Sequence, residues 1–426
     1  RVERHIGIRM PHQAPFVRNL HAAQDQPSPL LKGVHVISNA HSCHAQPLSD
    51  TPPRIKLVSI PPSLCLFPDI LHMSRSSPWS YPPQKRLTLV RAGILCPRLA
   101  FRHEFLPSPP QPSPVTPKRL YIAGHRGLAG RALMRLYEGR PEWEIITRTS
   151  AELDLRDPRA TLEFFEAERP EYVILSAARV GGIKASYLHP VEFLLENLQI
   201  QNSVIEAAHK TDVTKLLLLG STCIYPKAAE VPIREDSLLT GPIESTNEAY
   251  AIAKIAGIKL CAGYRQEYGR NFIVAMPANL YGPFDNFDPE HSHALPSMLR
   301  KFHQARVSGA ESVTLWGSGT PRREFLYVDD LASACAFLLD HYDGEDIVNI
   351  GCGDDISIRD AAERIKEVSG FQGRIEWDTS QPDGNPRRLL DVSKMTEMGW
   401  RTQMPFDEGL RITYQWFLDN IESARK

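Results

Sequence analysis

A short apolar segment that leads directly into a glycine-rich turn and then into a helical pattern constrains the fold of this chain more than any other feature. Residues 119–123 are followed by Gly124, Gly127 and Gly130, and then by leucines at helical spacing. Glycines let the backbone turn sharply and approach a pyrophosphate without an obstructing Cβ. The following helix N-terminus offers N–H groups and a partial positive charge to an anion. The pattern predicts a dinucleotide-binding strand, turn and helix, with an ordinary glycine-rich turn as the alternative.

Buried-strand patterns alternate with helical patterns further along the chain. This alternation predicts an α/β protein with a Rossmann-type doubly wound parallel sheet. Ligands of such sheets bind beyond the carboxyl ends of the strands, so residues 176–182 and 220–223 should lie at the active edge. The predicted strands are residues 143–147, 172–175, 215–219 and 272–276, and the predicted helices are residues 158–168, 191–210 and 247–268.

The glycine turn and the end of the second strand supply the candidate cofactor contacts. Arg148 stands where an NAD-selective site usually has an acidic residue. Together with Arg126 it provides two guanidinium groups for a 2′-phosphate, which favours NADPH/NADP+ unless both arginines are merely solvated. Asp154 is a candidate contact for the adenine end of the cofactor, or a helix cap. The predicted contacts in the turn are Gly124, His125, Arg126, Gly127, Leu128, Ala129 and Gly130.

Tyr250 and Lys254 are four residues apart in a predicted helix and therefore share one helical face. A lysine ammonium beside a phenol is expected to lower the tyrosine pKa, which suits proton exchange with a carbonyl or hydroxyl group. Ser221, at the end of the fourth strand, would help to orient the substrate oxygen. A tyrosine and a lysine at this spacing are common by chance. Their position after a dinucleotide-binding unit and near Ser221 nevertheless makes these residues a candidate active site.

Six segments together resemble the GDP-L-fucose synthase family, which belongs to the extended short-chain dehydrogenases. They read GHRGLAG, SAARVGGIKA, LGSTCIYPK, NEAYAIAKIAGIKLC, MPANLYGPFDNFDPEHSHALPSML and WGSGTPRREFLYVDDL, and the resemblance spans residues 118–422. It implies an NADPH-dependent, homodimeric enzyme that inverts GDP-4-keto-6-deoxy-D-mannose at C3 and C5 and then reduces C4 to give GDP-L-fucose.

The resemblance also implies roles for individual residues. Cys223 and His293 match the family's base and acid for epimerisation, and Ser221, Tyr250 and Lys254 match its reductase triad. Lys254 and His293 are expected to contact the cofactor as well. Without the resemblance, Cys223 would be interpreted as a small buried hydrophobic residue and His293 as an ordinary loop histidine.

Further contacts are predicted on both sides of the expected cleft. The segment beside the nicotinamide, otherwise a plain proline and glycine turn, comprises Pro277, Ala278, Asn279 and Leu280. Cations for a diphosphate and an aromatic face for stacking are expected on the substrate side. The predicted substrate contacts are Lys301, Trp316, Arg323 and Asp383. Arg322, Arg387 and Arg388 could belong to this group or to a solvated surface.

Two rival functions remain open at this point. A nucleotide-sugar epimerase or dehydratase of the same fold is the first, although a dehydratase should have an Asp-Glu pair where this chain has Cys223 and Ile224. A non-catalytic NADP(H)-sensing module is the second. Such a module would be expected to lack the Tyr250 and Lys254 pair, which is present.

Composition excludes several classes of protein. The 426 residues include 49 Lys+Arg and 50 Asp+Glu, so the formal net charge of −1 gives no basic footprint for nucleic acid or an anionic membrane. No apolar run approaches the roughly 20 residues that span a bilayer. The seven cysteines lack the paired spacing of disulfide scaffolds and metal sites. A cytoplasmic protein without a metal is expected.

The first part of the chain differs from the rest. More than half of the 35 prolines lie at or before residue 117, and residues 1–116 are predicted to be a disordered leader, with organellar targeting as the less favoured interpretation. An NADP-binding domain is expected at 117–285 and a smaller α/β GDP-sugar domain at 286–426, with residues 324–340 and 347–351 returning to the first. Apolar faces on helices 191–210 and 247–268 are expected to pair in the homodimer.

Overall fold

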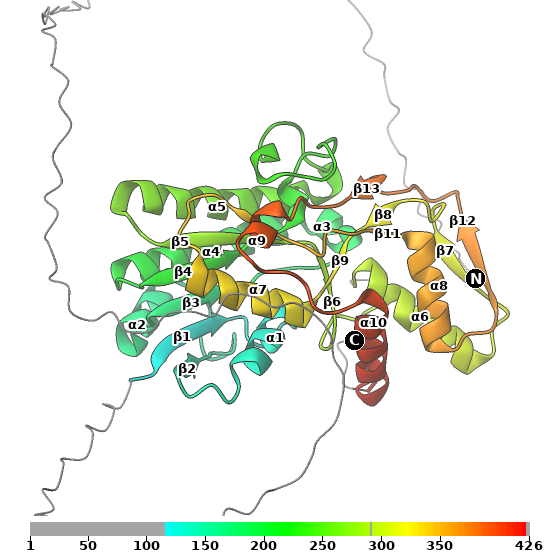
Figure 1. The fold of residues 1–426 in the computed structure, drawn as a ribbon, viewed down its shortest axis with the longest axis horizontal. Helices are drawn as coiled ribbons and strands as arrows, with labels where there is room; N and C mark the ends of the chain where they lie inside the picture. The colour runs from blue at the N-terminus through cyan, green and yellow to red at the C-terminus, as the bar shows by residue number, and fades with distance from the viewer. Residues whose placement is uncertain (1–115, 290–291, 423–426) are drawn as a thin grey trace, which may run out of the picture. The chain divides into compact units, whose positions relative to one another are not determined.

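A six-stranded sheet lies at the centre of the described chain (Figure 1). The structure, a computed structural model, describes residues 116–289 and 292–422. The strand order is β10-β5-β4-β3-β1-β2, and every neighbouring pair is parallel. The strands are β1 (Lys118–Ala123), β2 (Trp143–Ile146), β3 (Tyr172–Leu175), β4 (Lys215–Leu219), β5 (Phe272–Pro277) and β10 (Val348–Ile350). The predicted Rossmann-type parallel sheet is confirmed.

Helices cover both faces of this sheet, because the side chains of its central strands are apolar on both faces. Every residue of β4 and β5 is buried, as expected for central parallel strands covered on both faces. Helix α1 packs with α7, and α4 packs with α2 and α5. The flanking helices are α1 (Leu128–Tyr137), α2 (Pro158–Glu168), α4 (Pro190–Lys210), α5 (Glu248–Tyr268) and α7 (Val328–His341).

Local sequence signals explain where these helices begin and end. Asp157 caps α2 by accepting hydrogen bonds from the backbone N–H groups of Arg159 and Ala160, and Pro158 occupies the first helical position. Helix α5 ends at Gly269, which has a left-handed φ of +67°. These signals account for the close agreement between the predicted and observed helix bounds.

A second hydrophobic cluster is built mainly by the later part of the chain. It is centred on α6 (Ala294–Ser308), α8 (Ile358–Ser369) and α10 (Phe406–Asp419), beside the parallel pair β7 (Ser312–Trp316) and β12 (Arg374–Asp378). The domain boundary expected near residue 285 stays a prediction. The smaller elements are α3 (Ile183–Leu188), α9 (Ser393–Glu397), β6 (Asn279–Tyr281), β8 (Arg322–Arg323), β9 (Phe325–Tyr327), β11 (Ile356–Ser357), β13 (Arg387–Arg388), and the 3-10 helices η1 (Thr222–Ile224), η2 (Glu235–Ser237) and η3 (Ser245–Asn247).

Several sequence-based expectations concern parts of the chain that the structure does not describe. The predicted leader at residues 1–116 lies outside the described residues except for Thr116. Within residues 116–289 and 292–422, no helix is long and apolar enough to cross a membrane. In the same ranges, no group of three or more His, Cys, Asp or Glu side chains is arranged to hold a metal ion.

Candidate active site

The glycine turn lies at the point where strand order reverses in the sheet. β1 has β2 on one side and β3 on the other, so the loops after β1 and β3 meet there. Gly124 has a φ of +86°, and a Cβ on it would lie 2.7 Å from the backbone nitrogen of Ala177 in the loop after β3. A Cβ on Gly130 would collide with the Gly124 carbonyl oxygen. No side chain caps α1 at Gly127, so this tight backbone cradle fits the diphosphate of a dinucleotide.

The charged residues predicted to contact the adenine side of the cofactor have different surroundings. Arg126 is exposed on the turn. Arg148 donates hydrogen bonds to Glu168 and to the carbonyl of Thr147, whereas Asp154 forms an ion pair of 2.8 Å with Arg156. Arg148 and Asp154 are therefore engaged with neighbours, and their contacts with a cofactor stay predictions.

Four of the predicted catalytic residues gather at the carboxyl end of β4. Ser221 and Cys223 belong to the turn after this strand, and the Ser221 hydroxyl accepts a hydrogen bond of 3.5 Å from the Cys223 backbone N–H. Helix α5 packs against the turn and carries Tyr250 and Lys254. The Lys254 Nζ donates to the Leu219 carbonyl at 2.8 Å and lies 5.8 Å from the centroid of the Tyr250 ring.

Burial dominates the electrostatics of this cluster. It raises the pKa of Cys223 to about 11, against the hydrogen bond from Ser221 and the positive charges of Lys254 and Arg388. Burial also lowers the pKa of Lys254 to about 8. The pKa of Tyr250 is raised above its usual value near 10, mainly by burial and then by Cys223. The expected lowering of the Tyr250 pKa is not found in this structure, because desolvation of the phenolate raises it. The phenol is therefore protonated at neutral pH.

His293 lies directly before the first residue of α6. Its side chain is exposed, yet desolvation by the surrounding protein lowers its pKa below the usual value of 6.5. No hydrogen bond, ion pair or ring contact within the described ranges joins His293 to Cys223 or Tyr250. Their meeting around one substrate stays a prediction.

The predicted substrate contacts fall on neighbouring elements of the later part of the chain. Lys301, on α6, has its Nζ 5.9 Å from the ring centroid of Trp316, at the end of β7. Trp316 is 67 % exposed, which is unusual for an indole and leaves its face available for stacking. An aromatic ring beside a cation suits a nucleotide base and its phosphates.

Asp383 and Arg323 mainly hold loops together in this structure. The Asp383 carboxylate accepts hydrogen bonds from the Ser318 N–H and hydroxyl at 2.8 and 2.7 Å. Arg323 donates to the Asn385 carbonyl at 2.6 Å. Asp383 thus shapes the loop after Trp316, and its direct contact with a substrate stays a prediction.

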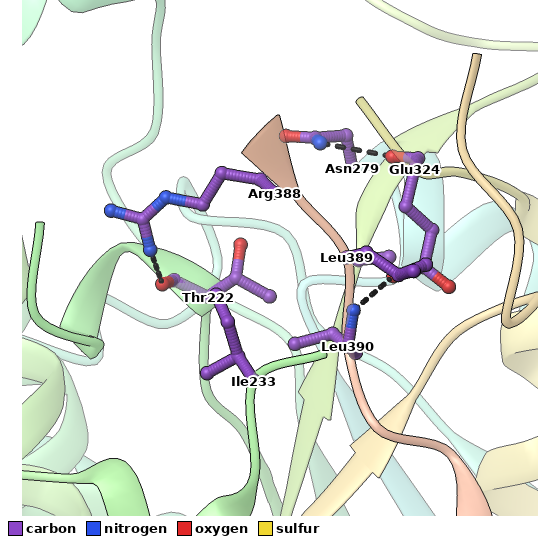
Figure 2. Close-up of a pocket in the computed structure, with 8 residues that line it drawn as sticks. Thr222, Ile233, Asn279, Glu324, Arg388, Leu389 and Leu390 are labelled. Atoms are coloured by element: carbon purple, nitrogen blue, oxygen red, sulfur yellow. Dashed lines mark hydrogen bonds between the residues drawn. The ribbon is translucent and has the colours of Figure 1, made fainter. Parts of the chain in front are cut away.

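Glu324 is an organising residue that the sequence reasoning missed (Figure 2). Only 1 % exposed, it accepts hydrogen bonds from the backbone N–H groups of Gly353 and Leu390 at 2.8 and 2.9 Å. Its backbone carbonyl accepts from the side chain of Asn279 at 2.9 Å. The available signal was an acidic residue within an apolar strand pattern. The adjoining predicted cofactor segment, Pro277 to Leu280, is buried at Pro277 and Ala278 and more open at Asn279 and Leu280.

Comparisons with known proteins agree with this arrangement. The sequence model of the NAD dependent epimerase/dehydratase family matches residues 120–351. GDP-L-fucose synthase 1 of Arabidopsis thaliana is 52% identical over 303 residues, covering 71% of this chain and 94% of the relative. GDP-L-fucose synthase of Escherichia coli strain K12 is 48% identical over 326 residues, covering 73% and 100%. The crystal structure of a GDP-L-fucose synthetase from Naegleria fowleri bound to NADP is 32% identical, with a TM-score of 0.68 and coverage of 75% and 99%.

Proposed function

The chain belongs to the NAD-dependent epimerase/dehydratase family, and we propose that it converts GDP-4-keto-6-deoxy-D-mannose into GDP-L-fucose by epimerisation at C3 and C5 and reduction at C4. The resemblance inferred from its motifs is confirmed by these relatives. The observation that carries the proposal is the Cys223 thiol beside Ser221, Tyr250 and Lys254 at the end of β4. A reductase without epimerisation needs no such base.

Epimerisation uses the acidity of C–H bonds next to the C4 ketone. The Cys223 thiolate takes the proton from C3 and later from C5, and the electron pair of each broken C–H bond moves into an enolate whose negative charge lies on the C4 oxygen. Hydrogen bonds from Ser221 and Tyr250 stabilise that oxygen. His293 returns a proton to the opposite face of the carbon, where the enolate electron pair forms the new C–H bond and the carbon is inverted. Between the two inversions the Cys223 thiol releases its proton to solvent and His293 takes one up from solvent, so that both can act again at C5. Cys223 and Tyr250 are half-buried, so each keeps a surface that a sugar can reach.

Reduction requires a proton at the C4 oxygen, and we assign its donation to Tyr250. Tyr250 is protonated at neutral pH because burial raises its pKa, and it can donate to the developing alkoxide. Lys254, held on the Leu219 carbonyl, keeps a positive charge beside the phenol. The residues of the glycine turn and the segment Pro277 to Leu280 would hold NADPH, which would supply the hydride for C4 when bound.

Arg126 is the residue we expect to distinguish NADPH from NADH, because it is exposed on the glycine turn where the cofactor is predicted to bind. Arg126→Ala should lower the preference for NADPH by about tenfold or more, because a hydrogen bond to a charged group contributes about 1.5–3 kcal/mol. The ratio of kcat/KM for the two cofactors measures this. Arg159→Ala, at an exposed position on α2, serves as the control. An unchanged ratio in Arg126→Ala would remove this arginine from cofactor selection.

We propose that the enzyme is a homodimer. Large apolar side chains are exposed on α3, α4 and α5, which contact one another within the chain. A second copy of the same surface would bury them across a two-fold axis. The exposed residues are Tyr187, Leu188, Val191, Leu195 and Ile252.

One assay tests the proposed function directly. The full chain is incubated with GDP-4-keto-6-deoxy-D-mannose and NADPH, and the product's stereochemistry is determined by NMR. GDP-L-fucose supports the proposal. A C4-reduced sugar without inversion at C3 and C5 would indicate a simple reductase, and cofactor binding without turnover would favour the sensing module.

A further inference from the structure

Four arginines on two paired strands form a short ladder. Among the described residues, the arginines form ion pairs with a carboxylate on only one face of this ladder. Strands β8 and β13 are parallel, with Arg387 opposite Arg322 and Arg388 opposite Arg323. Successive side chains of a strand point to opposite faces. On one face, Arg322 and Arg387 both bind the buried carboxylate of Asp355, each at 2.5 Å.

On the other face of the ladder no carboxylate within the described ranges binds an arginine directly, although the negative charge of Glu244 acts on Arg388. In the part of the chain that the structure describes, neither Arg323 nor Arg388 forms an ion pair. Arg388 is half-buried and donates instead to the carbonyl oxygen of Thr222 at 3.1 Å (Figure 2). When the Asn385 amide is oriented so that both of its ends form hydrogen bonds, its oxygen accepts from Arg388 Nη2 at 2.8 Å and its nitrogen donates to Glu244 at 3.2 Å. Burial lowers the pKa of Arg388, and the negative charges that oppose this effect are those of a Cys223 thiolate and of Glu244.

The Cys223 thiol belongs to the residue next to the carbonyl that Arg388 binds. Thr222 begins η1, and Cys223 is its next residue. Arg388 and Cys223 interact electrostatically: the guanidinium lowers the pKa of the thiol, and the thiolate would raise that of the arginine. The other charged or titratable groups facing the thiol are Lys254 and Tyr250, both from α5.

The strand that carries Arg388 is fixed from the opposite side. Two residues further on, the Leu390 N–H donates to the buried Glu324 carboxylate at 2.9 Å, and Glu324 also accepts from Gly353. Figure 2 shows both contacts around one pocket, with Arg388 reaching Thr222 and Leu390 reaching Glu324. The hydrogen bond of Leu390 to Glu324 therefore restrains the segment that carries Arg388, which helps to position the guanidinium.

We propose that Arg388 is a positioning residue for the epimerisation, which holds the Thr222–Ile224 turn through the Thr222 carbonyl and supplies a positive charge that favours the Cys223 thiolate. This inference rests on the proposed role of Cys223 as the base. It gives Arg388 a function distinct from that of Arg387, its neighbour on the face that binds Asp355.

The test measures the thiol itself. In the full chain, the rate of Cys223 alkylation by iodoacetamide is followed against pH by mass spectrometry of the peptide containing this cysteine. Arg388→Met should raise the midpoint of the profile by about one pH unit, at the low end of the shift that a neighbouring opposite charge produces. Arg387→Met, the matched control, should leave the midpoint unchanged. Arg388→Lys should restore most of the shift, whereas Arg388→Gln, which keeps a donor but no charge, should not.

Activity provides an independent reading. Solvent-deuterium exchange at C3 and C5 should fall about tenfold at neutral pH in Arg388→Gln, matching the expected one-unit shift, and recover at higher pH. An unchanged alkylation midpoint with only a raised KM for the keto-sugar would assign Arg388 to substrate binding and overturn the proposal, as would an equal shift in Arg387→Met. Normal exchange in Cys223→Ser would instead refute the proposed base, whatever the alkylation profiles show.

Discussion

Cys223→Ser is expected to abolish exchange of the C3 and C5 hydrogens of the substrate with solvent deuterium while leaving NADPH binding intact. A serine hydroxyl has nearly the same shape, but it is a far weaker acid than a thiol and cannot supply the anionic base. General base catalysis contributes about 10²–10⁴-fold, so the exchange rate should fall by at least that much. The measurement is the mass increase of recovered substrate in D2O, with NADPH omitted so that reduction does not remove it.

A second cysteine gives the matched control for this experiment. Cys352 is also half-buried and free, and its thiol donates to the Asp354 carbonyl in the loop after β10. Cys352→Ser should leave exchange near the level of the unsubstituted chain. Unchanged exchange in Cys223→Ser would refute the thiol as base and would leave a simple C4 reductase as the better description.

Local patterns predicted the sheet and its cofactor turn because their causes are local. The spacing of the glycines, the apolar runs of the strands and the capping residues of the helices act over a few neighbours. Tyr250 and Lys254 were placed together by helical spacing, and they do lie together on α5. Ser221 and Cys223 were placed near them by the rule that parallel strands present their carboxyl ends at one edge, and the structure brings them to that edge.

Residues whose partners are distant in sequence were not predictable in this way. Glu324 binds Leu390, 66 residues away, and Arg388 binds Thr222, 166 residues away. Nothing near either residue in the sequence specifies these contacts. The ion pair of Arg148 with Glu168 was missed for the same reason.

The protonation state of Tyr250 shows how tertiary structure reverses a local inference. A lysine one turn away favours the phenolate, and from sequence alone this interaction is the visible one. The folded protein surrounds the phenol, and desolvation raises its pKa instead. A protonated phenol is suited to give a proton to the C4 oxygen, whereas the base role proposed for Cys223 rests on its place beside Ser221 and Tyr250.

Tyr250→Phe is accordingly expected to reduce turnover to GDP-L-fucose by about 10²–10⁴-fold, the contribution typical of a positioned proton donor. Phenylalanine keeps the edge-to-face contact with Phe193, whose ring centroid lies 6.3 Å away, so the fold and GDP-sugar binding should be retained. The rate of NADPH oxidation measures turnover, and calorimetric titration with GDP measures binding.

Because the base and the proton donor are assigned to different residues, Tyr250→Phe should affect exchange and reduction differently. Because Cys223 is intact in Tyr250→Phe, deuterium should still enter C3 and C5, at a rate lowered only by the missing hydrogen bond to the C4 oxygen. Tyr268→Phe, an exposed position on the same helix, should behave like the unsubstituted chain. Normal NADPH oxidation in Tyr250→Phe would contradict the proton-donor role. Equal loss of exchange and reduction would mean that the phenol serves both steps. The assignment of the base to Cys223 and of the proton donor to Tyr250 would then be wrong.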